Sequence, residues 1–206
     1  EVDRGFSYSQ DAPLDMRMDR SRGITASEIV NTYAPGALVK ILRTFGEEKF
    51  ATRIVENIVK ARAKAPLNST QELAALIKAS IPAATRRTGG NPAKRTFQAL
   101  RIEANDELGA ITRALPVALD LLMVGGRVVV LSFQSLEDRL VKEFMRREAR
   151  DYDFEGTEDH PDFRHPRRPR GRELARKGIA ASESELSTNP RARSARLRVL
   201  ERLPEP

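Results

Sequence analysis

Apolar residues between positions 25 and 82 recur every three or four residues and are separated by helix start and stop signals. Such spacing predicts amphipathic helices whose apolar faces meet in a common core. Thr25 with Glu28, and Ser69 with Glu72, match the capping box, in which a hydroxyl and a carboxylate satisfy the free backbone N–H groups of a helix start. We therefore predict a small all-helical subdomain with helices over residues 26–33, 36–45, 47–64 and 69–82.

The pattern changes after Gly125, where residues 128–131 are apolar without alternation. A short, largely β-branched run of this kind predicts a strand of a parallel α/β sheet that is covered by helices on both faces. Ser135 followed by Asp138 fits an N-cap, which predicts a helix over residues 136–147. The expected fold class is therefore α/β.

The carboxyl end of this strand is the first candidate site. Ligands of open α/β sheets lie outside the carboxyl ends of the strands, which is where Ser132, Phe133 and Gln134 fall. A tight turn that binds no ligand is the alternative interpretation.

The remaining segments differ in order and composition. Apolar spacing over residues 97–115 predicts long helical material that Pro116 kinks or splits. Residues 151–188 are charged and rich in proline, so we expect them to lack order, with contact of their arginine run with RNA as the alternative. Alternation over residues 195–203 predicts an edge strand. We divide the chain into a loop segment (1–24), the helical subdomain (25–92), an α/β segment (93–150), a flexible loop (151–187) and a C-terminal strand (188–206).

Composition narrows the class of protein. The 206 residues are 40% hydrophobic, which is enough for a packed core, and they contain no Cys. The sequence has no membrane-length apolar run and no signal peptide at its start, so we expect a cytoplasmic protein. The formal charge of +7 favours a polyanionic partner, because each Lys or Arg that contacts a phosphate releases condensed counterions.

Metal and cofactor motifs are sparse. His160 and His165 could be drawn with Asp159 and Asp162 as a metal site, but the segment that carries them is not expected to hold ligands at fixed geometry. No predicted strand is followed by a glycine-rich loop and a helix start, the arrangement that binds a nucleoside cofactor. The glycines at 89–90 lack a preceding strand, and residues 86–95 are interpreted as a basic connector.

Five ordered motifs resemble a known family, and they cover nearly the whole chain except residues 151–187. They are GFSYSQDAPLDMRMD, TFGEEKFATRIVENIV, RTFQALRIEANDEL, SFQSLEDRLVKEFM and NPRARSARLRVLER. In this order and spacing they resemble the bacterial small-subunit (16S) ribosomal RNA cytosine-N4 methyltransferases, the RsmH or MraW family. The resemblance implies the C-terminal part of a Rossmann-like class I methyltransferase domain, interrupted by a helical insertion that residues 25–82 would form.

The resemblance also implies a cofactor and a set of site residues. The cofactor is S-adenosyl-L-methionine, and its binding segment in the family precedes the motifs matched here, so this chain alone is expected to be inactive. The implied substrate is small-subunit ribosomal RNA, with Asn105, Ser132 and Gln134 as the candidate catalytic residues near the target base. The implied RNA-contacting residues are Arg17, Arg95, Arg101, Arg139, Arg191 and Arg193.

Alternative interpretations of the arginines, of Gln134 and of the function stay open. Arg101 could instead pair with Glu103 or Asp106, and Arg139 with Glu137 or Asp138. Many family members have His where this chain has Gln134, and an amide orients a partner but takes no proton at neutral pH. From another functional class, a non-enzymatic RNA-binding or ribosome-associated module would use the same motifs only to hold its fold.

Overall fold

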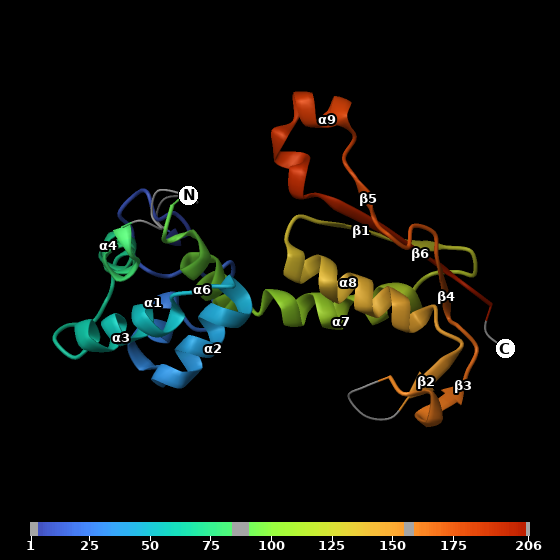
Figure 1. Ribbon diagram of the computed structural model, residues 1–206, viewed down its shortest axis with the longest axis horizontal. Coiled ribbons are helices and arrows are strands. Elements are labelled where there is room, and N and C mark those ends of the chain that lie inside the picture. Colours follow the sequence, from blue (N-terminus) through green and yellow to red (C-terminus); the bar gives the residue numbers. More distant parts are fainter. Residues whose placement is uncertain (1–3, 84–90, 155–158, 205–206) are drawn as a thin grey trace. The chain divides into compact units, whose positions relative to one another are not determined.

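A computed structural model describes residues 4–83, 91–154 and 159–204 of the chain (Figure 1). The chain forms two compact units, Glu1–Glu107 and Leu108–Pro206, which are treated separately below as unit 1 and unit 2. Of the basic connector expected at 86–95, residues 86–90 lie outside the described residues, whereas Lys94 and Arg95 belong to helix α6 (Lys94–Asn105) and not to a connector. Within the described ranges, no helix combines the length and the apolar character needed to cross a membrane.

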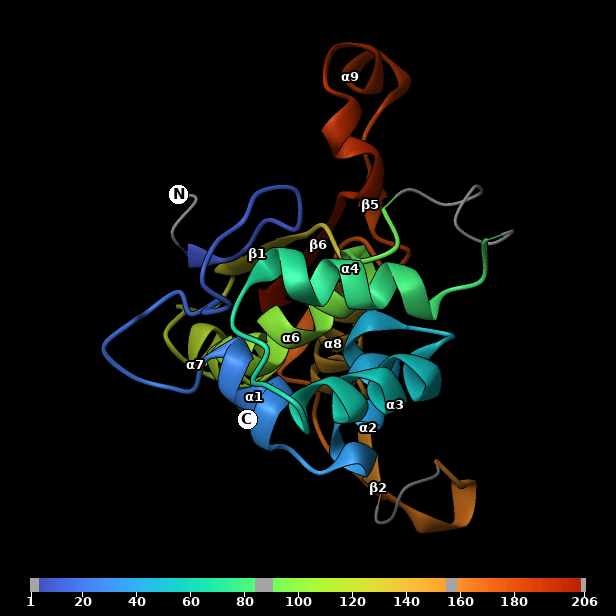
Figure 2. The same ribbon diagram turned by 90° about the vertical axis from the view of Figure 1, so that its left-hand side faces the viewer.

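Unit 1 is helical, as the apolar spacing predicts (Figure 2). Its helices are α1 (Ala26–Thr32), α2 (Pro35–Gly46), α3 (Ala51–Arg62), α4 (Thr70–Ser80) and α6 (Lys94–Asn105). Both predicted capping boxes are confirmed, because the hydroxyls of Thr25 and Ser69 accept from the backbone N–H of Glu28 and Glu72.

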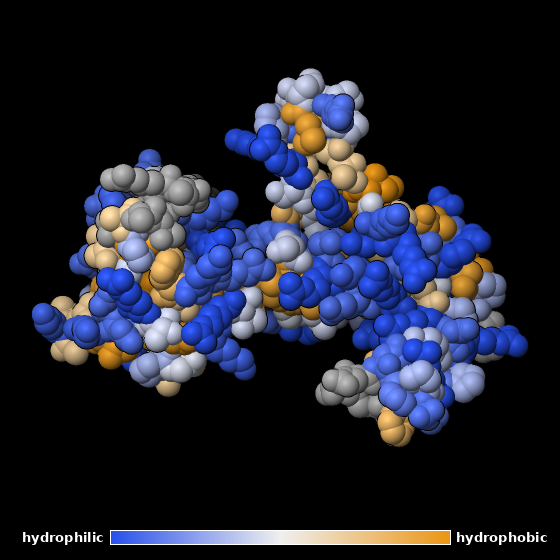
Figure 3. Space-filling view, in the orientation of Figure 1, coloured by the Kyte–Doolittle hydropathy of each residue, from blue (hydrophilic) through white to orange (hydrophobic). Residues whose placement is uncertain are grey.

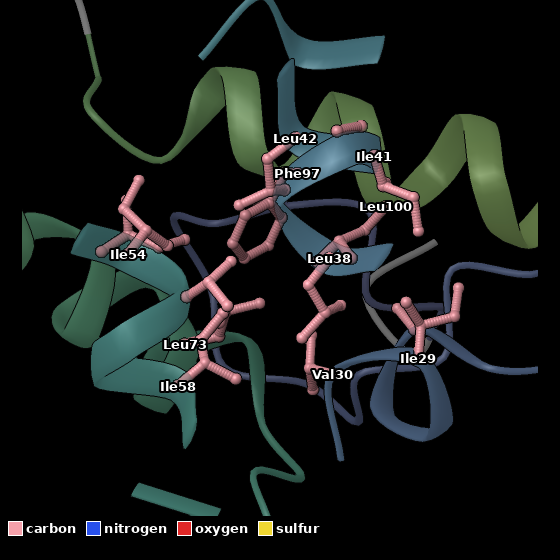
Figure 4. Packing of buried hydrophobic residues seen from close by; sticks show 14 of the residues in the cluster. Ile29, Val30, Leu38, Ile41, Leu42, Ile54, Ile58, Leu73, Phe97 and Leu100 are labelled. Atoms are coloured by element: carbon pink, nitrogen blue, oxygen red, sulfur yellow. The ribbon is translucent and has the colours of Figure 1, made fainter. Parts of the chain in front are cut away.

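The core of unit 1 draws on every one of these helices. Figure 4 shows side chains from α1, α2, α3, α4 and α6 converging on one cluster. Leu14 and Met16, from the irregular segment before α1, belong to the same cluster. Burial of this apolar surface is the main force that holds the unit together.

Helix α6 extends unit 1 beyond the boundary expected at residue 92. It packs along α2, and Gly46 lies so close to it that a Cβ there would come within 2.6 Å of the Arg95 carbonyl oxygen. The compact units therefore divide after Glu107, and residues 93–107 pack with the helical subdomain. The helical material breaks at Asp106, whose φ of 48° is left-handed. Pro116 does not split the helical material, since this residue lies inside α7 (Glu107–Asp120).

Unit 2 combines helices with a small sheet, which confirms the α/β class. The strands β1 (Arg127–Ser132), β6 (Arg196–Arg202) and β4 (Gly171–Glu173) follow one another across the sheet, and β5 (Ile179–Ala180) also pairs with β6. All these pairs are antiparallel, so the parallel arrangement predicted for residues 128–131 was wrong for this chain. The strand predicted at 195–203 is β6, which lies between neighbours and not at an edge.

Several short elements occupy the segment that was expected to lack order. Strands β2 (Tyr152–Phe154) and β3 (Arg164–Pro166) form a separate hairpin, with the 3-10 turn η2 (Pro161–Phe163) before β3. Helix α9 (Glu183–Thr188) and the 3-10 turn η3 (Pro190–Ser194) lead into β6. The expectation of a wholly irregular loop over 151–187 is therefore corrected for its described residues.

Only one face of the β1–β6–β4 sheet is covered. Helices α7 and α8 (Ser135–Glu148) lie on the same side of it, where Leu119, Val141 and Phe144 pack against Val128 and Leu200 (Figure 1). Side chains alternate across a strand, so the intervening positions point to the opposite face.

The opposite face carries an apolar row. Leu131 of β1 stands across from Leu197 of β6, which in turn stands across from Ile179 of β5. Val129, two residues along β1, is 58% exposed and Leu131 is 53% exposed. Burial on both faces, expected from the uninterrupted apolar run of β1, is therefore not found in this chain.

A pair of Leu→Ala substitutions tests this one-sided packing. Leu200→Ala should lower the free energy of unfolding of unit 2 by about 3 kcal/mol, because it empties a fully buried site. Leu131→Ala removes the same atoms from the exposed face and should cost less than about 1 kcal/mol. Equal losses in chemical denaturation would contradict the assignment of the two faces.

Candidate functional site

The turn between β1 and α8 is fixed by a carboxylate from the first turn of the helix. Glu137 Oε2 accepts hydrogen bonds from the backbone N–H groups of Phe133 and Gln134, both at 3.3 Å. Gln134 is the N-cap residue, and α8 begins at Ser135. The N-cap predicted at Ser135 with Asp138 was therefore wrong by one position, because Asp138 has a different partner.

That partner is Arg198, from the middle of β6. Its guanidinium donates to both carboxylate oxygens of Asp138, with Nε–Oδ1 at 2.6 Å and Nη2–Oδ2 at 2.9 Å. Arg198 is buried, 5% exposed, and faces the helices beside Leu200. The bidentate bond from Arg198 holds the pKa of Asp138 below its usual range and raises that of the arginine.

The predicted site residues at the end of β1 differ in accessibility. Ser132 is only 3% exposed, so its hydroxyl is closed to solvent in this chain. Phe133 is 52% exposed and Gln134 is half-buried. Phe133 and Gln134 are thus the two side chains of the turn that a ligand can reach directly.

Asn105, the third residue predicted near the target base, belongs to unit 1 and pins the loop before α1. Its Nδ2 donates to the carbonyl oxygens of Met16 at 2.7 Å and Arg101 at 2.8 Å, and its Oδ1 accepts from the Met18 backbone N–H at 2.6 Å. The amide therefore acts on the loop backbone. A direct contact of Asn105 with RNA would have to displace these bonds.

The loop itself has a defined shape. Met16 adopts a left-handed φ of 61° with its side chain buried, while Met18 is exposed. Asp15 accepts two hydrogen bonds from the Arg17 guanidinium, at 2.7 and 3.0 Å, and these bonds lower the pKa of Asp15. Arg17 thus has a carboxylate partner within its own loop.

The six arginines predicted to contact RNA fall into two groups. Arg17, Arg95 and Arg101 have partners within unit 1: Arg101 forms a bidentate pair with Glu107 at 2.7 and 3.0 Å, and Arg95 donates to the Glu47 carbonyl oxygen. Glu103 and Asp106 are the acceptors that the sequence suggests for Arg101, whereas the acceptor of this bidentate pair is Glu107. In contrast, no hydrogen bond or ion pair engages the exposed side chains of Arg139, Arg191 and Arg193 anywhere in the described ranges.

The metal site considered at His160, His165, Asp159 and Asp162 is not assembled among the described residues. Asp159 pairs with Arg164, and His160 lies 3.4 Å from Asp162. In the part of the chain that the structure describes, no cluster of three or more His, Asp or Glu side chains could hold a metal ion.

The family comparison covers almost the whole chain. The model of the MraW methylase family matches residues 1–203. The chain belongs to the MraW methylase family. This is a class I methyltransferase family whose members use S-adenosylmethionine.

Curated relatives agree with this assignment. The chain is 56% identical over 200 residues to a protein of Frankia alni, and 53% identical over 207 residues to one of Thermobifida fusca. Both relatives are named Ribosomal RNA small subunit methyltransferase H. The matches cover 97% and 100% of this chain but only 60% and 62% of the relatives, so the chain spans about three-fifths of their length.

Sequence reasoning missed the Asp138–Arg198 pair. Leu197 and Val199 were the apolar positions of the predicted strand, yet Arg198 and Leu200 face the covered side. The apolar alternation alone therefore does not show which side of the strand faces the helices. An Arg flanked by apolar residues was the only local signal, and its partner lies sixty positions earlier.

Removing the charge of Asp138 tests the importance of this pair. Asp138→Asn leaves Arg198 buried without a counter-charge and should cost about 3 kcal/mol of stability near neutral pH. Because the pKa of Asp138 is lowered in the folded state, its contribution is present above the usual Asp pKa of about 4 and is lost as the pH falls through the folded value. The stability difference between the two proteins should therefore shrink in acid, which unfolding at pH 7 and pH 3 will check; a constant difference would contradict the pair's role.

Proposed function

We propose that the chain is the C-terminal portion of an S-adenosylmethionine-dependent methyltransferase that methylates the N4 amine of a cytidine in small-subunit ribosomal RNA. The family match over residues 1–203 and the relatives' names support the methyltransferase and its class of RNA. The family resemblance of the motifs supports the cytosine-N4 specificity. The partner is the RNA itself or the assembled small subunit.

The described residues do not fit the cofactor. A nucleoside cofactor needs a strand, a glycine-rich turn and a helix start with free N–H groups. The β1–α8 turn has no glycine between Ser132 and Ser135, and Glu137 already occupies its backbone donors. An anionic group would meet the carboxylates of Glu137 and Asp138 there. We therefore assign cofactor binding to a part of the protein that this chain does not include.

The role left to this chain is to hold the RNA. Arg139, Arg191 and Arg193 are exposed cations that have no partner among the described residues, which suits contact with backbone phosphates. Gln134 can donate to and accept from the edge of a cytosine, since its side chain carries an amide N–H group and a carbonyl oxygen. The loop that Asn105 pins presents Met18 at the surface of unit 1.

A chimera tests the proposed activity. In the Thermobifida fusca relative, the 207 matched residues are replaced by this chain, and transfer of labelled methyl groups to small ribosomal subunits is measured. We expect methylation of a cytidine N4 by the chimera, and neither cofactor binding nor transfer by the chain alone. A chimera that binds RNA but transfers no methyl group would favour the non-enzymatic RNA-binding module.

Gln134→Ala in the same chimera tests the turn. If the amide orients the target base, turnover should fall by roughly 10- to 100-fold, because a polar partner is lost at the site. Thermal stability should change little, since the backbone N–H of residue 134 still donates to Glu137. A lower melting temperature with full turnover per folded enzyme would make Gln134 a structural residue only.

The unpaired arginines predict a salt dependence. Affinity for small-subunit RNA should fall linearly with the logarithm of salt concentration, and Arg191→Ala with Arg193→Ala should reduce that slope by roughly 1 to 2. The control removes two arginines that already have carboxylate partners, Arg22 and Arg127. A slope unchanged by the first double variant, or reduced equally by both, would remove Arg191 and Arg193 from the interface.

A further inference from the structure

The β2–β3 hairpin gathers arginines and aromatic rings on one face. Tyr152 pairs with Pro166 and Phe154 with Arg164, so these four side chains point to the same side. Arg150, two residues before Tyr152, has the same orientation by alternation. Figures 1 and 2 both show the hairpin projecting beyond the end of α8.

On this face the rings and guanidinium groups stack alternately. The Arg164 guanidinium carbon lies 4.3 Å from the ring centroid of Tyr152, and that of Arg150 lies 5.7 Å from Tyr152 and 5.6 Å from Phe154. Each contact is within the range of a cation–π interaction. The order Phe154, Arg150, Tyr152, Arg164 forms a continuous ladder, which we call the arginine–tyrosine face.

A third arginine, Arg168, extends the same face. The backbone N–H of Arg167 donates to the Asp151 carbonyl oxygen at 2.8 Å, which continues the strand register past Pro166. The next position places Arg168 opposite Arg150, and the Arg168 side chain is exposed. Like charges directly opposite are unfavourable in a hairpin, so the sequence keeps a repulsive pair here.

Asp159 is the carboxylate that pairs directly with Arg164 and Arg150 in the hairpin. Asp159 Oδ1 accepts from Arg164 Nε at 2.7 Å, and its Oδ2 accepts from the Tyr152 hydroxyl at 2.7 Å and lies 3.8 Å from Arg150. The guanidinium groups of Arg150 and Arg164 thus share one anion, and the surface over this region is hydrophilic (Figure 3).

The apolar core does not account for this hairpin. None of its residues belongs to the core cluster of unit 2, and two strands of three residues are marginal by themselves. The ladder stabilises the hairpin, but a single arginine would be enough to neutralise the Asp159 carboxylate. Asp and Glu outnumber Arg by six to four over residues 150–168, but Arg150, Arg164 and Arg168 gather with two rings on one face. Guanidinium groups beside aromatic rings suit single-stranded nucleic acid, through phosphates and through stacked bases.

We propose that the arginine–tyrosine face binds a single-stranded segment of RNA, with a phosphate taking the place of the Asp159 carboxylate beside Arg164. The proposal rests on the proposed function, which supplies RNA as the substrate class. In this arrangement Asp159 holds the guanidinium groups in position in the free protein and competes with the RNA for them.

Because Asp159 and the RNA compete for the same guanidinium groups, two substitutions should change the affinity for RNA in opposite directions. Arg164→Gln and Asp159→Asn break the same ion pair. Arg164→Gln removes a phosphate donor and should weaken binding of the 206-residue chain to a labelled single-stranded RNA from the small subunit by roughly tenfold. Asp159→Asn removes the competing charge and should tighten binding by about two- to fivefold. Fluorescence anisotropy at several salt concentrations will measure both.

Matched controls separate this effect from net charge and from folding. Arg127→Gln and Asp120→Asn break other Arg–Asp or Arg–Glu pairs of unit 2 and should change affinity by less than either hairpin variant. Protection of the Arg167 amide from hydrogen exchange, through its bond to Asp151, reports whether the hairpin stays paired in each variant. Only variants that keep this protection are compared.

Each result decides the proposal. Weaker binding by both hairpin variants with the Arg167 amide protected would make the ladder purely structural and overturn it. Unchanged binding by both would overturn it while RNA binding elsewhere, and so the proposed function, stands. Equal affinity for duplex RNA or heparin would show a charge effect alone and also overturn it. Absence of RNA binding by the unaltered chain, together with an inactive chimera, would overturn both proposals.

Discussion

Unit 2 depends on one buried cation that must be neutralised. Arg198 lies in the middle of β6, the strand that pairs with β1, β4 and β5, and it faces the helices. A guanidinium at that depth is tolerated only with a carboxylate at close range. Asp138 supplies it from the first turn of α8, so the start of the helix is held at the level of Arg198. The β1–α8 turn, which carries the candidate residue Gln134, is fixed as a consequence.

The same arrangement leaves the sheet half covered. Because Arg198 and Leu200 are committed to the side of α7 and α8, Leu197 and Val199 must face the other way, beside Leu131 and Val129. An apolar sheet face of this kind is normally packed against further structure. Its exposure here agrees with a chain that spans about three-fifths of its relatives' length.

The sequence predicted correctly those features that depend on partners close in the chain. The capping boxes at Thr25 and Ser69 need partners only three residues away, and both are present. The start of α8 was predicted one residue too late because two carboxylates, Glu137 and Asp138, competed for one role and the choice depended on Arg198. Which side of β6 faces the helices depends on the same Asp138–Arg198 pair, and alternation of apolar residues contains no information on a counter-charge sixty positions away. Residues 151–188 contain few apolar side chains, and the hairpin within them is held by cation–π contacts that periodicity does not detect.

Whether an arginine contacts RNA or stabilises the fold is likewise decided by its partners. Arg101 and Arg139 had the same two interpretations in the sequence, with carboxylates near both. In the structure Arg101 takes Glu107, six residues away, whereas Asp138 is already occupied by Arg198 and Glu137 by the backbone of the turn. Arg139 is therefore left exposed by competition that starts at a buried strand position. Under the proposed function, Arg139 is thus one of the exposed cations that remain after the buried arginine of unit 2 has taken its counter-ion.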